Sequence, residues 1–379
     1  MLAHFAHHLL TALPTPLLPF IRNEFDLDYT QLALVVSAFS LSYGISQLPA
    51  GWLADRIGPR ILITVGTCGV AIAGALVGLS GTYILMMVFL VLMGVAGGGY
   101  HPSSAPLVSA AVEPKKRGRA LGIHAVGGGT SYFLAPIIAA AIAGAWGWRV
   151  SFIGLAVPTA IFGIIFYKYL GRWSAPMSDQ SEISSHHGDK AKTQGNLRLL
   201  VAFMVLTVFT AGITRSITVF IPVYLVDQFG ASEQTAAFFL SIQYSAGLWV
   251  SPIGGYMSDR LGRVPLMLTT SLVVGAVVYL LNLAPYAWGI ITLLLIMGIC
   301  IYIRIPVSEA YIMGRVPERH RSTIYGIYYF SMTEAGAVFA PIIGALIDHF
   351  DFYTTFTIAS ISVIAVMLGC AVFLLGSRN

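Results

Sequence analysis

Charged side chains inside long apolar stretches are the residues of this chain most able to do chemistry. Arg304, Glu309 and Glu334 each lie in a stretch long enough to cross a membrane. An ionisable side chain at that depth costs about 2.5–3.5 kcal/mol on insertion scales, so each is a functional hypothesis by default. The further candidates of this kind are Arg215, His101 and His124, with His4, His7 and His8 near the start of the chain.

Three of these residues are predicted to lie at one depth. Since a helix rises 1.5 Å per residue, Arg304, His101 and Glu334 each lie about 15 Å inside one end of their stretch, which is the middle of a membrane. Glu309 and His124 are expected to be shallower on that side, and Arg215 is expected toward the opposite side.

An arginine at this depth is suited to binding an anion. A guanidinium binds a carboxylate or phosphate by donating two parallel hydrogen bonds, so Arg304 and Arg215 are predicted substrate ligands. The alternatives are structural: an ion pair of Arg304 with Glu334 or Glu309, and one of Arg215 with Asp227. Tyrosines within the apolar stretches offer a flat face and a hydroxyl to the same ligand. The predicted substrate-binding residues are Arg304, His101, Arg215, Tyr100, Tyr302 and Tyr328.

Glu334 and Glu309 are the predicted proton sites. Loss of water favours the neutral carboxyl, whereas a nearby arginine favours the charged one, and a conformational change can switch the balance. His101 is a third candidate, because imidazole titrates near neutral pH. A hydrogen-bonded core histidine is the alternative at that position.

These side chains require membrane-spanning elements to position them. Hydrophobic residues make up 57% of the 379 residues and charged residues 10%, far from the soluble average of about a quarter charged. The charged clusters separate twelve stretches of the length that a bilayer demands. They cover approximately 2–21, 31–53, 61–80, 83–111, 120–144, 149–170, 198–225, 234–256, 264–284, 287–313, 323–347 and 354–375.

The basic residues predict the orientation. With the N-terminus in the cytoplasm, 17 of the 21 lysines and arginines fall in inner loops and the tail, as expected when cytoplasmic loops carry the positive excess. The net charge of +5 is therefore explained by the basic residues of the cytoplasmic loops. The sequence gives no support for nucleic-acid binding. The first stretch lacks a basic leader and a cleavage site, so it is expected to be a retained helix.

A repeated signature indicates that the chain is a duplicated unit. The pattern G-x-x-x-D-R-x-G occurs twice, 204 residues apart, and other pairs keep nearly the same offset. Two equivalent halves are therefore expected: residues 1–170 and 198–379, joined by a polar cytoplasmic linker at 171–197. Each signature is predicted to be a gate whose aspartate meets a helix N-terminus in one conformation only; the alternative is a solvated turn that needs glycine. The predicted gating residues are Gly51, Asp55, Arg56, Gly58, Gly255, Asp259, Arg260 and Gly262.

This plan resembles the major facilitator superfamily, whose best-known loop motif is similar to the repeated signature. The resemblance implies an all-α membrane protein of twelve transmembrane helices in two pseudo-symmetric six-helix bundles, working by alternating access. Within the superfamily, Phe25, the Tyr100-His101-Pro102 run and the Gly127-Gly128-Gly129 run resemble the fosmidomycin-resistance group of efflux proteins. One feature departs from the pattern: Leu90 stands where many drug/proton antiporters of the superfamily carry an arginine.

The expected function is proton-coupled export of a small anionic or amphipathic organic compound, by a monomer in the bacterial inner membrane with both termini in the cytoplasm. Uptake or exchange of an organic anion is the alternative, and a lipid-moving or signalling protein is the alternative from another class. The expected partners are the substrate, protons and membrane lipid. No cofactor and no metal are expected, the His186-His187 pair being a solvated loop. The chain has no H-E-x-x-H or G-x-S-x-G pattern, so no enzyme is expected.

Overall fold

The computed structural model describes residues 1–113, 116–172, 197–316 and 318–376, with the side chains of 251, 252, 318–323, 325 and 376 left out. The predicted linker at 171–197, with His186 and His187, lies almost wholly outside this part. The first half contains α1 (Leu2–Thr11), α2 (Pro14–Phe25), α3 (Tyr29–Ile57), α4 (Pro59–Gly78), α5 (Tyr83–Gly97), α6 (Tyr100–Ala110), α7 (Arg117–Trp146) and α8 (Trp148–Arg172). The second contains α9 (Leu197–Phe229), α10 (Glu233–Ser245), the 3-10 turn η3 (Ala246–Leu248), α11 (Val250–Leu261), α12 (Arg263–Leu280), α13 (Trp288–Met313), α14 (Glu318–His349) and α15 (Phe352–Gly376).

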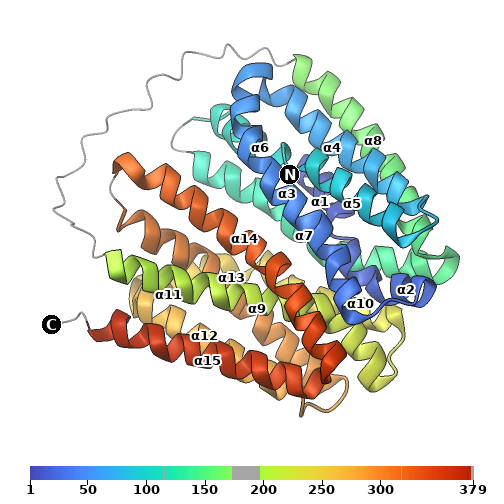
Figure 1. Ribbon diagram of the computed structural model, residues 1–379. Coiled ribbons are helices and arrows are strands. Elements are labelled where there is room, and N and C mark those ends of the chain that lie inside the picture. Colours follow the sequence, from blue (N-terminus) through green and yellow to red (C-terminus); the bar gives the residue numbers. More distant parts are fainter. Residues whose placement is uncertain (114–115, 173–196, 317, 377–379) are drawn as a thin grey trace.

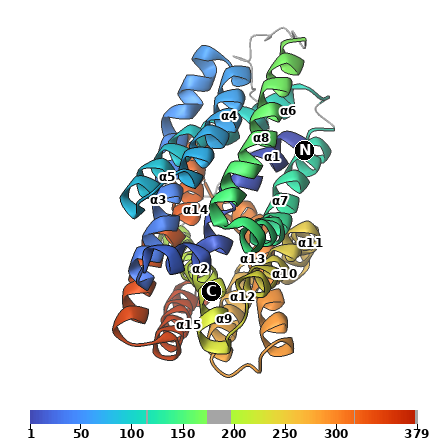
Figure 2. The same ribbon diagram turned by 90° about the vertical axis from the view of Figure 1, so that its right-hand side faces the viewer.

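The helices gather into two bundles, one from each half of the sequence, as the blue-to-green and yellow-to-red parts of Figure 1 show. Turned by 90°, the first half lies above the second (Figure 2). Clusters of buried apolar side chains fill both halves. The predicted all-helical membrane fold is thus confirmed.

The count of continuous spans differs from the twelve predicted. In the described residues, ten helices are long and apolar enough to cross a membrane, and an eleventh span is bent by 61° near η3. The first predicted span is two short helices, α1 and α2, because Pro14 and Pro16 supply no backbone donor to continue the helix. The residues at this break, from Leu10 to Leu13, are buried.

The two halves are related by the offset that the sequence predicts. At mid-depth, Gly44 of α3 packs against the carboxyl of Glu334 in α14, and Gly129 of α7 packs against Leu248. Gly44 and Leu248 are 204 residues apart, and Gly129 and Glu334 are 205 apart. The two contacts are therefore the same contact seen from opposite halves, which is what a pseudo-twofold axis between parallel repeats produces.

The bundles are joined at the end of the molecule opposite the repeated signatures, here called the sealed end. The carboxylate of Asp348 in α14 accepts hydrogen bonds from the backbone amides of Tyr29 (2.8 Å) and Thr30 (2.9 Å) and from the Thr30 hydroxyl (2.6 Å), at the start of α3. Asp227 of α9 accepts hydrogen bonds from Arg22 and, at 2.6 Å, from the Tyr29 hydroxyl. Deeper in, the Ser37 hydroxyl donates to a carbonyl of α14 at 2.7 Å.

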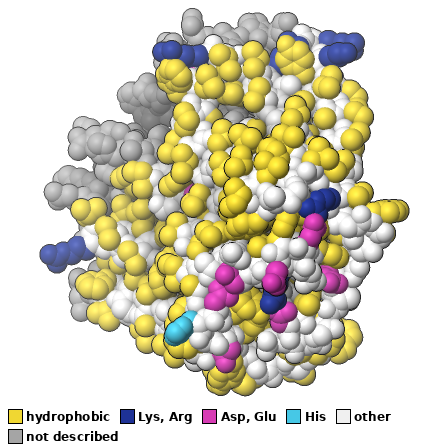
Figure 3. All heavy atoms as spheres, turned by 45° about the vertical axis from the view of Figure 1, so that its right-hand side comes forward, with side chains coloured by type: hydrophobic (Ala, Val, Ile, Leu, Met, Phe, Trp, Pro, Cys, Tyr) yellow, Lys and Arg dark blue, Asp and Glu magenta, His cyan; other side chains and the backbone are white. Residues whose placement is uncertain are grey.

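Charge is divided between the two ends. Acidic side chains gather at the lower right of Figure 3 with basic side chains among them, and other basic ones lie along its upper and left edges, around a largely hydrophobic surface. Arg22 and Arg149 form ion pairs with Asp227 and Glu24 at the acidic end. The acids belong to the sealed end, and they are Glu24, Asp26, Asp28, Asp227, Glu233, Asp348 and Asp351. The division supports the predicted orientation, with the signature end in the cytoplasm, and the orientation itself stays a prediction.

Candidate functional site

A cavity of about 420 Å³ lies inside the second bundle, between α9, α12, α13 and α14. Two cationic side chains line it, Arg215 of α9 and Arg304 of α13, together with hydroxyl groups and apolar side chains. Its lining residues include Thr207, Thr214, Met267, Ser308, Tyr328 and Met332. The structure thus brings together three of the six predicted substrate ligands: both arginines and Tyr328.

Arg304 is 6% exposed. Its guanidinium donates to the Ser271 hydroxyl at 2.6 Å and makes longer contacts of 3.4 to 3.5 Å with Thr270 and with backbone carbonyls, including that of Thr207. No carboxylate among the described side chains pairs with it, so the alternative of an ion pair with Glu334 or Glu309 is not what the structure shows. A buried cation held by neutral groups alone retains its need for an anion.

Arg215 lies on the wall of the same cavity, as an exposed side chain near the middle of α9. Asp227, its predicted alternative partner, pairs instead with Arg22 at the sealed end. Since α9 has 33 residues, about 50 Å, it is longer than a hydrocarbon core of about 30 Å, and the expected position of Arg215 toward the outer side stays a prediction.

Glu334 lies between the two bundles. It is 6% exposed, its Oε2 has no hydrogen-bond partner among the described residues, and its carboxyl packs on Gly44 of the other bundle. Arg215 lies within electrostatic range of it. Three tyrosine hydroxyls from α3, α7 and α14 share its surroundings: Tyr43, Tyr132 and Tyr329. Tyr302, another predicted ligand, lies beside Gly247 and within range of Arg215.

The two repeated signatures form the same turn. Gly58 and Gly262 end α3 and α11 with φ of 86° and 85°, which explains the glycine. Arg56 stacks on Trp52 at 4.0 Å and Arg260 on Tyr256 at 4.7 Å. Asp55 and Asp259 are exposed, with no ion pair to another described side chain. The gate role of these residues stays a prediction.

Tyr100 and His101 lie apart from this cavity, in a cluster of histidines inside the first bundle. The Nε2 atoms of His8 and His101 are 3.1 Å apart. His4 stacks on His124 at 4.3 Å, and His7 stacks on Tyr100 at 4.3 Å. His101 is not among the residues that line the cavity of Arg304, and the sequence-based expectation that the two face one ligand from opposite halves stays a prediction. Glycines make the cluster possible, since a side chain at Gly128 would meet the His4 ring at 2.7 Å.

Two features were missed by the sequence analysis. The aspartates that join the bundles, Asp227 and Asp348, bind residues 198 and 319 positions away, which no periodicity reveals. The histidine cluster did leave a signal. His4 and His8 are four residues apart, and that spacing places two imidazoles on one helix face, as in metal-binding helices.

The sequence matches the family model for the Major Facilitator Superfamily twice, over residues 1–214 and 203–379. The chain belongs to the Major Facilitator Superfamily. It is therefore an integral, multi-pass membrane transporter of small organic substrates, and the spans and the twofold architecture agree with this membership. The repeated match is the duplication that the 204-residue offset predicts.

Relatives within the superfamily differ in what their names say they carry. The chain is 29% identical to a probable sulfoacetate transporter of Cupriavidus necator, over 70% of this chain and 66% of that one, which is about two thirds of that relative's length. It is 23% identical to the fosmidomycin resistance protein of Escherichia coli, over 92% of this chain and 85% of that one. This second likeness bears out the predicted nearness to that group.

Among solved structures, the chain is similar to a bacterial homologue of the human lysosomal transporter Spinster, in an inward-facing and unoccupied conformation. The TM-score is 0.76 at 17% identity, over 99% of this chain and 93% of that one. At this identity the similarity establishes the fold of the superfamily member and nothing of its substrate.

Proposed function

We propose that this protein carries a small organic anion, bound between Arg304 and Arg215, and couples its movement to protons through Glu334. The observation that carries this is the burial of Arg304 on a cavity wall with only neutral partners among the described side chains. A carboxylate, sulfonate or phosphonate supplies the missing counter-charge and matches the guanidinium with two parallel hydrogen bonds. The alternating-access cycle then moves this site from one side of the membrane to the other.

The cavity suits a small ligand. Its wall combines two cationic side chains with hydroxyl groups and apolar side chains, and small-molecule sites typically have such a lining, with a few polar groups placed among apolar ones. Tyr328 and Tyr302 offer aromatic faces and hydroxyls beside the two charges. Sulfoacetate, the ion in the name of one relative, is a small anion of this kind and serves as the first probe.

Glu334 links the anion to the proton. Arg215 stabilises the charged carboxylate of Glu334 while the cavity is empty. A bound anion neutralises Arg215 and repels the carboxylate, so Glu334 takes up a proton when the anion enters. Anion and proton therefore bind together and travel together. Because α3 covers Glu334 at Gly44, separation of the bundles is what exposes this carboxyl to the second side.

This coupling favours symport, and with the signature end in the cytoplasm of a bacterial inner membrane the proton gradient drives uptake. Export in exchange for protons is the second candidate, favoured by the likeness to the fosmidomycin resistance protein over 92% of the chain. Exchange requires that solute and proton compete, as a cationic or amphipathic solute would for Glu334. Glu309, on the same helix as Arg304, is the second proton site under either scheme. Each chain holds a complete cavity, which supports function as a monomer.

The test is counterflow and net uptake of radiolabelled sulfoacetate in proteoliposomes, with and without a pH gradient and with a trapped pH dye. Arg304→Lys keeps the positive charge but loses the pair of parallel donors of the guanidinium. The affinity for sulfoacetate should therefore fall about 10–100-fold, which corresponds to the loss of about 1.5–3 kcal/mol of charged hydrogen bonding. Glu334→Gln should abolish the response to the gradient. Arg119→Lys, an exposed arginine, is the control and should transport normally.

Each arm has a result that contradicts it. Undiminished binding by Arg304→Lys removes that arginine from the site, and uptake that ignores the gradient removes proton coupling. Proton movement opposite to the solute selects exchange over symport. Organic anions that fail to stabilise the purified protein against heat would favour a lipid-moving or signalling protein, because a ligand selective for the folded state must stabilise it.

A further inference from the structure

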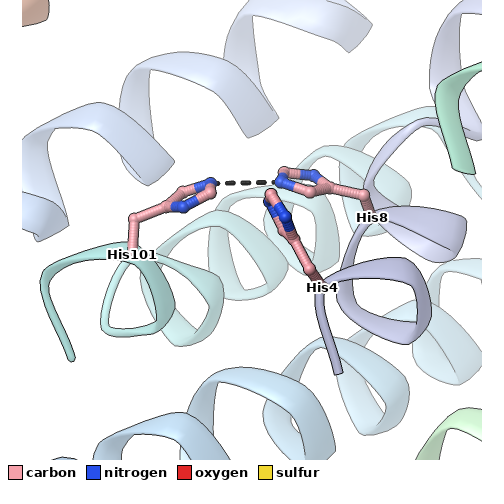
Figure 4. A group of neighbouring side chains, drawn as sticks. All are labelled: His4, His8 and His101. Carbon is pink, nitrogen blue, oxygen red and sulfur yellow. Dashed lines mark hydrogen bonds between the residues drawn. The ribbon is translucent and has the colours of Figure 1, made fainter. Parts of the chain in front are cut away.

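The histidine cluster of the first bundle holds a set of ligand atoms that transport through the second bundle does not use. His4 and His8 lie on one face of α1, and His101 lies at the start of α6. One ring nitrogen from each of these three residues lies within 4.8 Å of the others. Figure 4 shows the three rings converging on one space.

We propose that His4, His8 and His101 form a binding site for a divalent first-row transition metal such as Zn²⁺. Neutral imidazole is the ligand that Zn²⁺, Ni²⁺ and Cu²⁺ favour. Two nitrogens on a tetrahedral zinc ion with bonds of about 2.0–2.1 Å stand about 3.3 Å apart. The Nε2 atoms of His8 and His101 are already 3.1 Å apart. A nitrogen of His4 lies within 4.8 Å of both, so closing the set requires an inward shift of at most about 1.5 Å.

The groups behind these rings fix the nitrogens that face the ion. Nδ1 of His4 lies 2.8 Å from the backbone carbonyl of His124. Because a carbonyl only accepts, this nitrogen carries the proton and Nε2 of His4 is left bare. Such an outer hydrogen bond is the usual support of a metal-binding histidine.

His8 is held in the same manner. Its Nδ1 lies 2.9 Å from the hydroxyl of Thr11, and that hydroxyl directs its own hydrogen to the backbone carbonyl of His8 at 3.5 Å. With its hydrogen directed there, the Thr11 oxygen accepts from Nδ1 of His8 in the tautomer that the proposal requires, and that tautomer leaves Nε2 of His8 bare as well. In the metal-bound form His101 also carries its proton on Nδ1, whereas without metal its Nε2 donates to His8.

The three-histidine site is largely buried, and burial favours the protonation state that binds a metal ion. His4 and His8 are 8% and 5% exposed, and neutral imidazoles are both the form that burial favours and the form that binds metal. The ligand set contains no carboxylate, so the bound ion keeps its positive charge. Three protein ligands leave the fourth position open for water or an anion. Tyr132 lies between the site and the bundle interface. Its ring centroid is 5.1 Å from that of His8 and 5.6 Å from that of Tyr244 in the second bundle.

The experiment uses the full chain, purified in detergent through an affinity tag that contains no histidine and stripped with a chelator. Titration with Co²⁺ should give one equivalent bound and the visible absorption of a tetrahedral ion, and Zn²⁺ should displace it at one equivalent. His8→Gln and His101→Gln should each lower the affinity at least 100-fold. Thr11→Val keeps all three ligands and should lower it about 10-fold, through the lost support of His8. His349→Gln, at an exposed histidine of the sealed end, should bind like the native chain.

A variant that restores a ligand keeps the test independent of folding. His101→Cys offers a thiolate in place of the imidazole, so it should bind Co²⁺ again and add a sulfur-to-cobalt charge-transfer band. Absence of stoichiometric binding by the native chain would overturn the proposal, leaving a hydrogen-bonded histidine cluster. Equal binding by His101→Gln, or no thiolate band in a folded His101→Cys protein, would do the same.

Discussion

The joint at the sealed end makes a quantitative prediction about the conformational equilibrium. Asp348 of α14 receives three hydrogen bonds from the first turn of α3, two of them from backbone amides. It thus caps a helix of the other bundle across the interface. Asp348→Ala removes this cap without changing the cavity or the repeated signatures. We expect it to raise the population of the state in which the sealed end is open.

The size of the effect follows from the contacts. A hydrogen bond to a charged acceptor contributes about 1.5–3 kcal/mol where it is buried, and a carboxylate at an exposed helix N-terminus about 0.3–1 kcal/mol. Asp348 is an exposed residue, so solvent screens it and the sum of its contacts is taken as about 1–2 kcal/mol. That corresponds to a shift of about 5–30-fold in the equilibrium between the closed and open states. Asp348→Asn keeps one acceptor oxygen and should give a smaller shift.

Thiol labelling reads this population directly. Ser37 is 2% exposed, between the bundles on the sealed side, and a cysteine there reacts with a bulky thiol reagent only when the sealed end opens. The native cysteines Cys68, Cys300 and Cys370 are first replaced with alanine. When opening and closing are fast relative to labelling, the rate is proportional to the open population. Asp348→Ala should therefore label about 5–30-fold faster.

The matched control is Asp351→Asn. Asp351 is an acid of the same end, and its carboxylate accepts a hydrogen bond from the backbone of Thr354 in its own bundle, at 2.6 Å. That bond holds the pKa of Asp351 below its ordinary value, and it does not cross the interface. A labelling rate unchanged by Asp348→Ala, or raised equally by Asp351→Asn, would refute the account of the joint.

Two further predictions concern glycines. Gly44→Ala places a methyl group where the Glu334 carboxyl packs. The flexible Glu334 side chain should move aside, so thermal stability should stay near normal while transport loses its dependence on the pH gradient. An unaltered pH response would show that the contact is incidental. Gly58→Ala and Gly262→Ala each impose φ near +85° on a residue with a side chain, at a cost of about 1–3 kcal/mol, so each should lower the unfolding temperature. Gly51→Ala, in open space within α3, should leave the unfolding temperature unchanged. Equal unfolding temperatures in all three variants would contradict this.

The architecture was predictable because hydropathy and repetition are local or periodic properties of the chain. Ten predicted spans correspond to helices or helix pairs whose ends differ by only a few residues, and the 204-residue offset anticipated the pseudo-symmetric contacts of Gly44 and Gly129. The error at the first span has a visible cause, since Pro14 and Pro16 are in the sequence and break any helix there. The bend in the eighth span depends on packing around Gly247, against Tyr302, and no local signal marks it.

The site was predictable in its residue types and less so in its grouping. Scarcity of charge in apolar stretches identified Arg304 and Glu334, which are buried in the structure, and Arg215, which is exposed on the cavity wall. Grouping them required the lengths and crossings of α9, α13 and α14, which determine that both arginines share one wall while Glu334 faces the other bundle. His101 has the same depth as Arg304 by count, yet α1 lies beside it, and the partners that a histidine finds there are other histidines.

The repeated signatures contain glycines of two kinds, and the difference between them bears on the gate. Gly58 and Gly262 are required by the backbone of this conformation. Gly51 and Gly255 are helical, and a side chain at either would meet nothing within 4 Å. The conformation of this structure therefore does not require glycine at these two positions. Since both halves nevertheless place glycine at this position, we infer that glycine is required in another conformation, in which other backbone comes close. Closure of the bundles at the signature end, with the sealed end released, would provide that approach, and in that state Asp55 and Asp259 would gain the helix partners that the described side chains do not supply here.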